Sequence, residues 1–365
     1  MNSAANPYAT DKVLWHPDRL ADMRAGRRPV PINLQLIISD FCNQDCHWCA
    51  YRASNGLSVE QFAGPDKSGA ISKNPMRMIP YEKALEIVDD AASLGVKSVT
   101  WTGGGEPTVH PQHLELFGHA LDLGLECSLN TNGVVFRKGW ADVLPRFAYA
   151  RFSIDAGTPE EYGRIRRVPP SMYETALRNM HNLRAEIEQQ GTGCVVGAGY
   201  VVEPTNIENV LEGVARIRDH GAAYVRLASM QSLDGVAPYG DRLQAAQDVC
   251  AEATATLTTD GFKVVNLFEG SLGQRMEDPY CGFQELVVYV GGNQKVYRCC
   301  YTAFTALGDV GDLTNQRFSD WWKSQETAER YRDFDARECF TCPMVQKNAA
   351  IASIVKSTPI HSNFV

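Results

Sequence analysis

Hydrophobic and polar positions alternate along the chain in blocks that predict strands and helices in turn. Short runs rich in Val, Ile and Leu predict six strands, at residues 32–39, 98–101, 125–130, 150–154, 195–202 and 224–228. Amphipathic runs, several opened by Pro or Asn and closed by Gly, predict helices at 81–94, 112–123, 172–189 and 207–220. Strands that alternate with helices indicate an α/β fold, here a partial (β/α)6 barrel of the TIM type with a parallel sheet.

This pattern sets the expected division of the chain. We expect an N-terminal extension at 1–30, the barrel core at 31–235, a connection of helical and strand character at 236–280, a small α+β module at 281–345 and a tail at 346–365. Gly, Ser, Pro and Asn interrupt the pattern at 51–78, which predicts a long exposed loop. That loop is either a lid over a site or a plain surface insertion.

Composition narrows the classes of function. The chain has 365 residues and a formal net charge of -8, which argues against a nucleic-acid partner because phosphate binding needs a basic surface. The sequence has no signal-peptide pattern at its start and no apolar run long enough to span a membrane, so we expect a soluble cytoplasmic protein. In a reducing cytosol, eleven cysteines in local clusters indicate metal ligation rather than disulfides.

The first cluster of cysteines follows the first predicted strand. Cys42, Cys46 and Cys49 have the spacing Cys-x3-Cys-x2-Cys, which supplies three soft thiolates from one tight loop. Soft thiolates favour iron–sulfur clusters, zinc or copper(I). On a cluster of four irons, three protein thiolates leave one iron open to another molecule. The alternative is three unrelated thiols of the core.

Polar groups follow the next three predicted strands as well. The second strand ends in a Thr-Gly-Gly-Gly-Glu-Pro run at 102–107, the third in Asn-Thr-Asn-Gly at 130–133 and the fourth in Ser-Ile-Asp-Ala at 153–156. In parallel barrels, functional groups gather at the carboxyl ends of the strands. We therefore expect these residues and the cysteine loop to form one site.

Together, the Cys-x3-Cys-x-aromatic-Cys loop, the Gly-Gly-Glu-Pro turn and the polar strand ends resemble the radical S-adenosylmethionine (SAM) enzyme superfamily, over roughly residues 31–235. The resemblance implies that Cys42, Cys46 and Cys49 hold a [4Fe-4S] cluster whose open iron binds the amino and carboxylate groups of SAM. It also implies reductive cleavage of SAM to a 5'-deoxyadenosyl radical, which abstracts hydrogen from substrate. The electron would come from an external one-electron donor such as flavodoxin or ferredoxin.

Eight further residues match cofactor-binding positions of that family: Trp48, Gly104, Gly105, Glu106, Ser153, Asp155, Arg166 and Asn206. The resemblance implies that the tryptophan packs near the adenine and that the two glycines and the glutamate meet the methionyl amino group. The serine and the aspartate would approach the ribose or the carboxylate, and the arginine would pair with the carboxylate. Asn206 stands at a ribose-contact position that is also an ordinary place for a helix cap.

A second group of cysteines lies near the carboxyl end. Four thiolates there could bind tetrahedral zinc or a fully ligated [4Fe-4S] cluster, and their spacing alone does not separate the two. The stretch from 308 to the final Cys-x2-Cys resembles the module called Twitch, an abridged relative of the SPASM domain, which implies one auxiliary [4Fe-4S] cluster. By position its ligands would be Cys281, Cys299, Cys339 and Cys342, with Cys300 as the rival of Cys299.

Other cysteines and histidines have ordinary structural explanations. Cys127, Cys194 and Cys250 fall on predicted strands or a helix, where small buried thiols are common. His110 and His113 follow the Gly-Gly-Glu-Pro turn, where the family often has histidine without a metal.

Three hypotheses of function follow. In the first, a radical SAM oxidoreductase oxidises a small polar metabolite, such as a sugar, aminocyclitol or nucleotide, and the auxiliary cluster accepts the electron. In the second, the enzyme modifies a ribosomally made peptide, although only about 30 residues precede the first predicted strand, too few for the leader-binding domain of many such enzymes. In the third, an iron–sulfur or zinc protein without catalysis carries electrons or holds a partner, and Glu106 is idle. The sequence names no general base and no substrate.

Overall fold

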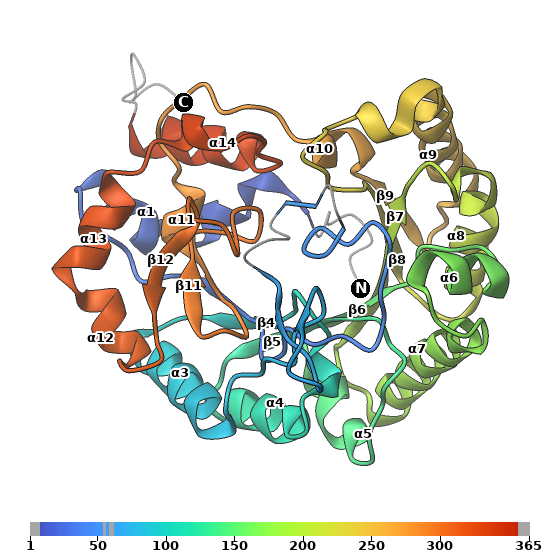
Figure 1. Cartoon of the computed structure of the whole chain (residues 1–365), viewed down its shortest axis with the longest axis horizontal. Helices are drawn as coiled ribbons and strands as arrows, with labels where there is room; N and C mark the ends of the chain where they lie inside the picture. Colours follow the sequence, from blue (N-terminus) through green and yellow to red (C-terminus); the bar gives the residue numbers. More distant parts are fainter. Residues whose placement is uncertain (1–7, 54–55, 58–61, 357–365) are drawn as a thin grey trace.

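The computed structural model describes residues 8–53, 56–57 and 62–356. Its main sheet has ten strands in the order β12-β11-β10-β1-β4-β5-β6-β7-β8-β9. The strands from β10 to β9 in that order run parallel, whereas β11 and β12 are antiparallel additions at one edge. The sheet curves into an open barrel, and the helices lie around its outside (Figure 1).

The strands of the described residues are short. Their bounds are β1 Asn33–Leu36, β2 Gly64–Pro65, β3 Ile71–Ser72, β4 Ser98–Trp101, β5 Glu126–Thr131, β6 Tyr149–Ser153, β7 Val195–Val202, β8 Tyr224–Ser229, β9 Lys263–Asn266, β10 Val287–Val290, β11 Lys295–Tyr297 and β12 Asp309–Asp312.

The helices lie between the strands and after them. The α-helices are α1 Pro17–Arg24, α3 Tyr81–Leu94, α4 His113–Asp122, α5 Trp140–Val143, α6 Pro159–Arg166, α7 Ser171–Gln190, α8 Val210–Asp219, α9 Leu243–Leu257, α10 Phe268–Leu272, α11 Phe283–Leu286, α12 Phe318–Lys323, α13 Gln325–Arg332 and α14 Val345–Val355. The 3-10 helices are η1 Thr10–Trp15, η2 Pro107–Val109, η3 Leu144–Arg146, η4 Ile207–Asn209, η5 Ala237–Arg242 and η6 Ala336–Glu338.

The predicted α/β partial barrel is confirmed, with all six predicted strands present as β1 and β4 to β8. The sheet is wider than predicted. Segment 236–280, expected as a connection, contributes β9, which pairs with β8. On the other side β10 pairs with β1, so the C-terminal module continues the barrel sheet. Segment 51–78, expected as a loop, includes the small antiparallel pair of β2 and β3.

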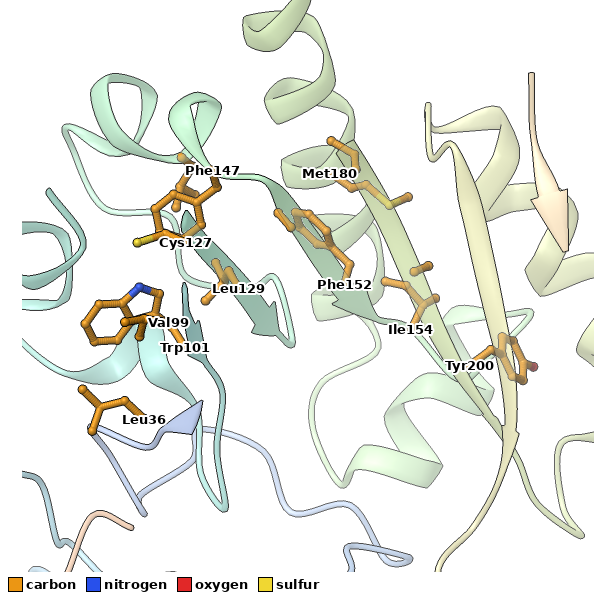
Figure 2. Close-up of a cluster of buried hydrophobic side chains, with 14 of the residues drawn as sticks. Leu36, Val99, Trp101, Cys127, Leu129, Phe147, Phe152, Ile154, Met180 and Tyr200 are labelled. Carbon is orange, nitrogen blue, oxygen red and sulfur yellow. The ribbon is translucent and has the colours of Figure 1, made fainter. Parts of the chain in front are cut away.

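The main hydrophobic core lies between the sheet and the surrounding helices. On β4 to β6, Val99, Leu129 and Phe152 are fully buried on this outer face (Figure 2). Helix α7 contributes to this core a stripe of buried residues spaced three or four apart, which is the period of one helix face: Tyr173, Ala176, Leu177, Met180, Leu183 and Ile187. The predicted core thiols Cys127, Cys194 and Cys250 all lie in this core.

The inner face of the sheet is polar. The Asn33 side chain on β1 donates to Thr100 Oγ1 on β4 (3.1 Å), and Ser128 on β5 donates to the same oxygen (3.0 Å). The interior of the barrel therefore presents hydrogen-bonding groups instead of an apolar filling.

The C-terminal helices fasten the module to the barrel. Arg317, just before α12, pairs with the buried Asp90 of α3 (2.5 Å). Trp321 and Trp322 are buried, and Arg28 lies over the ring of Trp322. Within the described residues, no helix has both the length and the apolar character needed to span a membrane.

Candidate functional site

The cysteine loop rests on the carboxyl end of helix α6. The amide of Asp45 donates to the carbonyl of Arg166 (3.0 Å), and the amide of His47 donates to the carbonyl of Ile165 (3.1 Å). Helix α6 begins at a Thr158 cap, whose side chain accepts from the amide of Glu161 (3.2 Å). A well-defined helix thus fixes the position of the loop.

The three thiols of the loop are neighbours. Cys46 interacts electrostatically with both Cys42 and Cys49. Burial raises the pKa of Cys42, and it raises the pKa of Cys46 to about 12. A thiol must lose its proton to bind a metal, so binding of iron by these thiols would release their protons.

A cation of the chain already faces the thiols. Arg52 is 5% exposed, and its side chain lies near Cys49, Cys42 and Cys46. It donates to the carbonyl of Gln44 (2.9 Å), and its Nε is buried without a hydrogen-bond partner. The indole nitrogen of Trp48 in the same loop is buried without a partner too. These unpaired donors next to three thiols fit an anionic thiolate–iron centre.

The described residues contain no group of three His, Cys, Asp or Glu side chains that converges on a single metal ion. This geometry does not disfavour a cubane cluster, because each thiolate then binds a different iron at a different corner. A donor set of sulfur alone fits an iron–sulfur cluster.

The Gly-Gly-Glu-Pro turn packs directly against the cysteine loop. A Cβ on Gly105 would lie 2.3 Å from the carbonyl oxygen of Phe41, so only glycine allows this approach. The Glu106 carboxylate is buried and accepts hydrogen bonds from Thr108, from the Thr131 hydroxyl (2.7 Å) and from the amide of Asn132 (2.7 Å). Glu106 therefore joins the ends of β4 and β5, and its contact with a methionyl amino group stays a prediction.

Asn132 is a site residue that the sequence analysis did not single out. Its side-chain amide donates to Asn43 Oδ1 (2.7 Å) and lies 4.0 Å from the sulfur of Cys42. Its position in the polar run at the end of the third predicted strand was the only available signal. The two partners of Asn132 precede it in the sequence by 89 positions (Asn43) and 90 positions (Cys42), so no local pattern specifies these contacts.

Asp155 and Arg166 form a buried ion pair. Arg166 also donates to the side chain of Gln44 in the cysteine loop (2.5 Å), and Asp155 accepts from the amide of Val201 (2.7 Å). The structure thus brings both predicted residues to the loop, with each already paired to the protein. Ser153 stands at the end of β6, two residues before Asp155.

Asn206 is fully buried, and its side chain forms hydrogen bonds with backbone groups. The side chain donates to the carbonyls of Asp155 (3.0 Å) and Val201 (2.8 Å) and accepts from the amide of Glu203 (2.9 Å). No side-chain capping bond starts the following helix from this residue. Its predicted ribose contact stays a prediction.

The four predicted auxiliary thiols lie together. Cys281 interacts electrostatically with Cys299, Cys339 and Cys342, and Cys339 interacts with Cys299 and Cys342. Burial raises the pKa of Cys281 to about 12 and that of Cys342 to about 11. A two-way backbone bridge between Gln274 and Cys342 holds the segment of the last of these cysteines.

Cys300 has different surroundings from its neighbour Cys299. Besides Cys299, the charged groups near its thiol are Lys347 and Arg226. Its carbonyl accepts from the hydroxyl of Tyr51 (3.5 Å), which follows the first cysteine loop. These contacts favour Cys299 over Cys300 as the fourth auxiliary ligand.

An aromatic cluster connects the two cysteine sites. Phe304 packs on Phe62 with 4.8 Å between ring centroids and on Tyr51 with 5.7 Å. Tyr289 on β10 shares a hydrogen bond with the Tyr51 hydroxyl (3.1 Å). The same cluster covers Gly104, whose Cβ position would lie 2.5 Å from the Phe62 ring.

A cavity of about 410 Å³ opens beside the first cysteine loop. Cys46, His47 and Arg52 line one side, and residues 72–74 line the other. Its volume falls in the range of small-ligand sites.

His110 and His113 do not form a metal pair. The His110 ring bonds with the carbonyl of Ile79 (3.0 Å), and His113 Nδ1 bonds with the carbonyl of His110 (2.7 Å). Each ring therefore forms a hydrogen bond with a backbone carbonyl.

Comparisons with known proteins agree with this geometry. The family model described as "Radical SAM superfamily" matches residues 36–212. The chain is 22% identical to a PqqA peptide cyclase of Granulibacter bethesdensis over 328 residues, which cover 86% of this chain and 79% of the relative. It is also 24% identical over 210 residues to a protein of Pyrobaculum aerophilum named "Probable GTP 3',8-cyclase", of whose length it spans only 61%.

Solved structures agree in fold. SuiB of Streptococcus suis, bound to its precursor peptide SuiA, has a TM-score of 0.60 at 15% identity, covering 94% of this chain and 76% of SuiB. The Gly-Gly-Glu-Pro turn packs on the cysteine loop, and the family match includes both. The chain belongs to the radical SAM superfamily, whose members use a [4Fe-4S] cluster and S-adenosylmethionine.

Proposed function

We propose that this protein is a radical SAM enzyme that modifies a peptide. The observation that carries the proposal is the similarity to PqqA peptide cyclase, which covers 86% of the chain and so extends well beyond the radical SAM core at 36–212. The likeness to SuiB adds that the same fold accommodates a precursor peptide in that protein.

The comparisons lend no support to the expected oxidation of a small polar metabolite. The relative that matches 86% of the chain is named for cyclisation of a peptide, which favours the peptide alternative, whereas an AdoMet-dependent heme synthase of Methanosarcina barkeri matches 73%. The oxidoreductase class therefore has no support beyond the sequence analysis, and we propose peptide modification without naming the bond formed.

The residues at the barrel mouth would hold the cofactors in defined positions. Cys42, Cys46 and Cys49 would bind the [4Fe-4S] cluster, with Arg52 and Arg166 supplying positive charge beside it. When bound, cluster and SAM together supply a 5'-deoxyadenosyl radical that takes a hydrogen atom from substrate. The aromatic cluster of Tyr51, Phe62 and Phe304 would exclude water from this side of the site.

The remaining predicted residues would shape the SAM site. Glu106, Asp155 and Asn206 hold the ends of β4 to β7 together through buried hydrogen bonds. We assign Trp48 to a contact with the cofactor because its indole nitrogen is buried without a hydrogen-bond partner, and Ser153 because it is partly exposed at the end of β6. Gly104 and Gly105 allow the turn to pack against the loop.

The C-terminal thiols would hold an auxiliary [4Fe-4S] cluster. Cys281, Cys299, Cys339 and Cys342 would ligate all four irons, which leaves none open to substrate and favours electron transfer. An external donor such as flavodoxin or ferredoxin would supply the electron for SAM cleavage.

A deuterium-transfer experiment tests the proposal. The organism that carries this gene is grown in deuterated medium, and its extract is separated into a peptide fraction and a small-metabolite fraction. Each is incubated anaerobically with reconstituted protein, SAM and dithionite. We expect deuterium in 5'-deoxyadenosine from the peptide fraction only. Transfer from the metabolite fraction alone would restore the small-metabolite hypothesis.

A further inference from the structure

The inner face of the barrel carries an unusual pair of arginines. On β6, the outward residues Ala150 and Phe152 are fully buried, whereas Tyr149, Arg151 and Ser153 keep accessible surface on the inner side. On β8, Arg226 likewise keeps accessible surface between buried neighbours. Both arginine side chains therefore face the barrel interior and are partly exposed there.

Glycines on β7 make room between the two arginines. Strand β7 lies between β6 and β8, and it pairs Gly197 with Arg151 and Gly199 with Arg226. A Cβ on Gly197 would lie 2.3 Å from the ring of Tyr224, so the ring occupies the place of a side chain. The Arg151 side chain lies over Gly199 in the same way, at 3.8 Å. The Arg151 side chain therefore reaches over the bare part of β7, and Arg226 stands on the strand beyond it.

Neither arginine forms a direct ion pair with a described acid, and the carboxylate of Asp155, which interacts electrostatically with Arg226, is already paired with Arg166. Arg151 donates to the hydroxyl of Tyr8 (3.0 Å), and Arg226 lies over the Tyr8 ring. The Nε of Arg226 is buried without a hydrogen-bond partner. Among residues 8–53, 56–57 and 62–356, neither arginine forms an ion pair with Asp or Glu.

A third cation approaches from the C-terminal module. Lys347 on α14 interacts electrostatically with Arg226 and with Cys300. Within the described residues it has no acidic partner either. The cationic cluster of Arg151, Arg226 and Lys347 thus spans the barrel and the module.

Unpaired cations in a protein interior cost free energy, because they lose hydration without gaining a counter-charge. An arginine cannot relieve this cost by losing its proton. Tyr8 relieves part of it: although burial raises its pKa, Arg151 and Arg226 hold that pKa below the ordinary value. A ligand carrying a full negative charge would relieve more.

We propose that the cluster of Arg151, Arg226 and Lys347 binds a carboxylate of the substrate. This inference rests on the proposed peptide substrate, whose carboxylate is either an acidic side chain or a C-terminus. Arg151 precedes Ser153 by two residues, about 7 Å along the strand, so a group bound there lies just below the proposed cofactor site. The cluster then determines which part of the peptide faces the radical.

Binding of small probes tests the proposal on the full chain. The first pair is N-acetylglutamate α-amide and N-acetylglutamine α-amide, which differ only in a side-chain carboxylate. The second pair is N-acetylalanine and N-acetylalanine amide, which differ in the C-terminal carboxylate. By calorimetry at low salt, we expect the carboxylate of one pair to bind about tenfold tighter than its amide. The pair that shows this preference identifies the source of the carboxylate.

Variants show whether the cluster is responsible. Arg226→Gln and Arg151→Gln should each remove the preference, and Arg151→Lys, which keeps the charge, should restore part of it. Arg218→Gln changes a partly exposed arginine on α8 that pairs with Asp219, and it should keep the preference. Equal binding within both pairs, or a preference that survives in Arg226→Gln, would overturn the inference. So would tighter binding of inorganic phosphate than of either carboxylate.

The two proposals fail separately. If deuterium transfer from peptides is seen without a carboxylate preference, the inference is wrong and the proposed function stands. If the preference is seen and only metabolites transfer deuterium, the peptide substrate is wrong.

Discussion

Arg52 is the residue whose charge bears most directly on the first cysteine site. Its buried guanidinium lies near all three thiols, and its Nε has no hydrogen-bond partner. A positive charge beside an iron–sulfur cluster stabilises the reduced form, which carries one more negative charge. We expect Arg52→Gln to lower the reduction potential of the bound cluster by on the order of 100 mV. Potentiometric titration followed by electron paramagnetic resonance measures this shift.

Arg167→Gln is the matched control for that experiment. Arg167 lies in the same region but is exposed, and it pairs with the exposed Asp45. Solvent screens such a pair, so the potential of this variant should stay at the wild-type value. Equal potentials in wild type and Arg52→Gln would contradict the role of Arg52.

Single residues also show where sequence reasoning stops. The spacing of Cys42, Cys46 and Cys49 is local, so the sequence carries it in full. Arg52 follows the last of these cysteines by three positions, yet nothing in the sequence says that its side chain turns back toward them. The hydrogen bonds that Glu106 accepts from Thr131 and Asn132 at the end of β5 depend on the pairing of β4 with β5, which the sequence pattern does not specify.

At the scale of elements, helix α4 begins at the buried His113. Burial lowers the pKa of His113 from 6.5 to about 4, so the folded protein holds a neutral ring while the unfolded chain is protonated below pH 6.5. The stability is therefore full above pH 6.5 and falls as the pH drops toward 4, by up to about 3 kcal/mol. We expect His113→Asn to remove this part of the pH dependence, measured by urea unfolding between pH 4 and 7. The exposed His181 on α7 offers the control His181→Asn, which should retain it.

The turn after β11 holds the C-terminal module against the cysteine loop. Phe304 is fully buried there and packs on Tyr51, Phe62 and Tyr297. We expect Phe304→Ala to cost about 3–5 kcal/mol of stability and to speed hydrogen exchange in β10 to β12. Leu233→Ala, at a side chain that is 52% exposed, should change neither. Unchanged exchange in Phe304→Ala would show that the module docks by other contacts.

Prediction of the elements succeeded where the apolar pattern was continuous. Strand β7, for example, has the apolar sequence Val-Val-Gly-Ala-Gly-Tyr-Val-Val, and the prediction covers it in full. Strand β9 has polar residues at both ends, Lys263 and Asn266, which leaves only two valines as its apolar pattern. The pairing of β10 with β1 joins residues about 250 positions apart, and no local signal specifies it.

At the scale of the whole molecule, two sites of cysteines share one continuous sheet. If each holds a [4Fe-4S] cluster, the reconstituted protein binds about eight irons per chain. We expect Cys342→Ala to lower this number to about four and to retain SAM cleavage without peptide modification. Iron quantification and the absorbance of the two centres give the measurement. Full peptide modification by Cys342→Ala would show that the auxiliary centre is structural or absent.

The most direct measurement is release of 5'-deoxyadenosine by the reconstituted protein with SAM and dithionite under anaerobic conditions. Wild type should release it, and Cys46→Ala should release none while it keeps the auxiliary iron. Cys250→Ala, which changes a core thiol remote from both sites, should release it as wild type does. A wild-type protein with both centres loaded that releases no 5'-deoxyadenosine would contradict a radical-generating site at Cys42, Cys46 and Cys49.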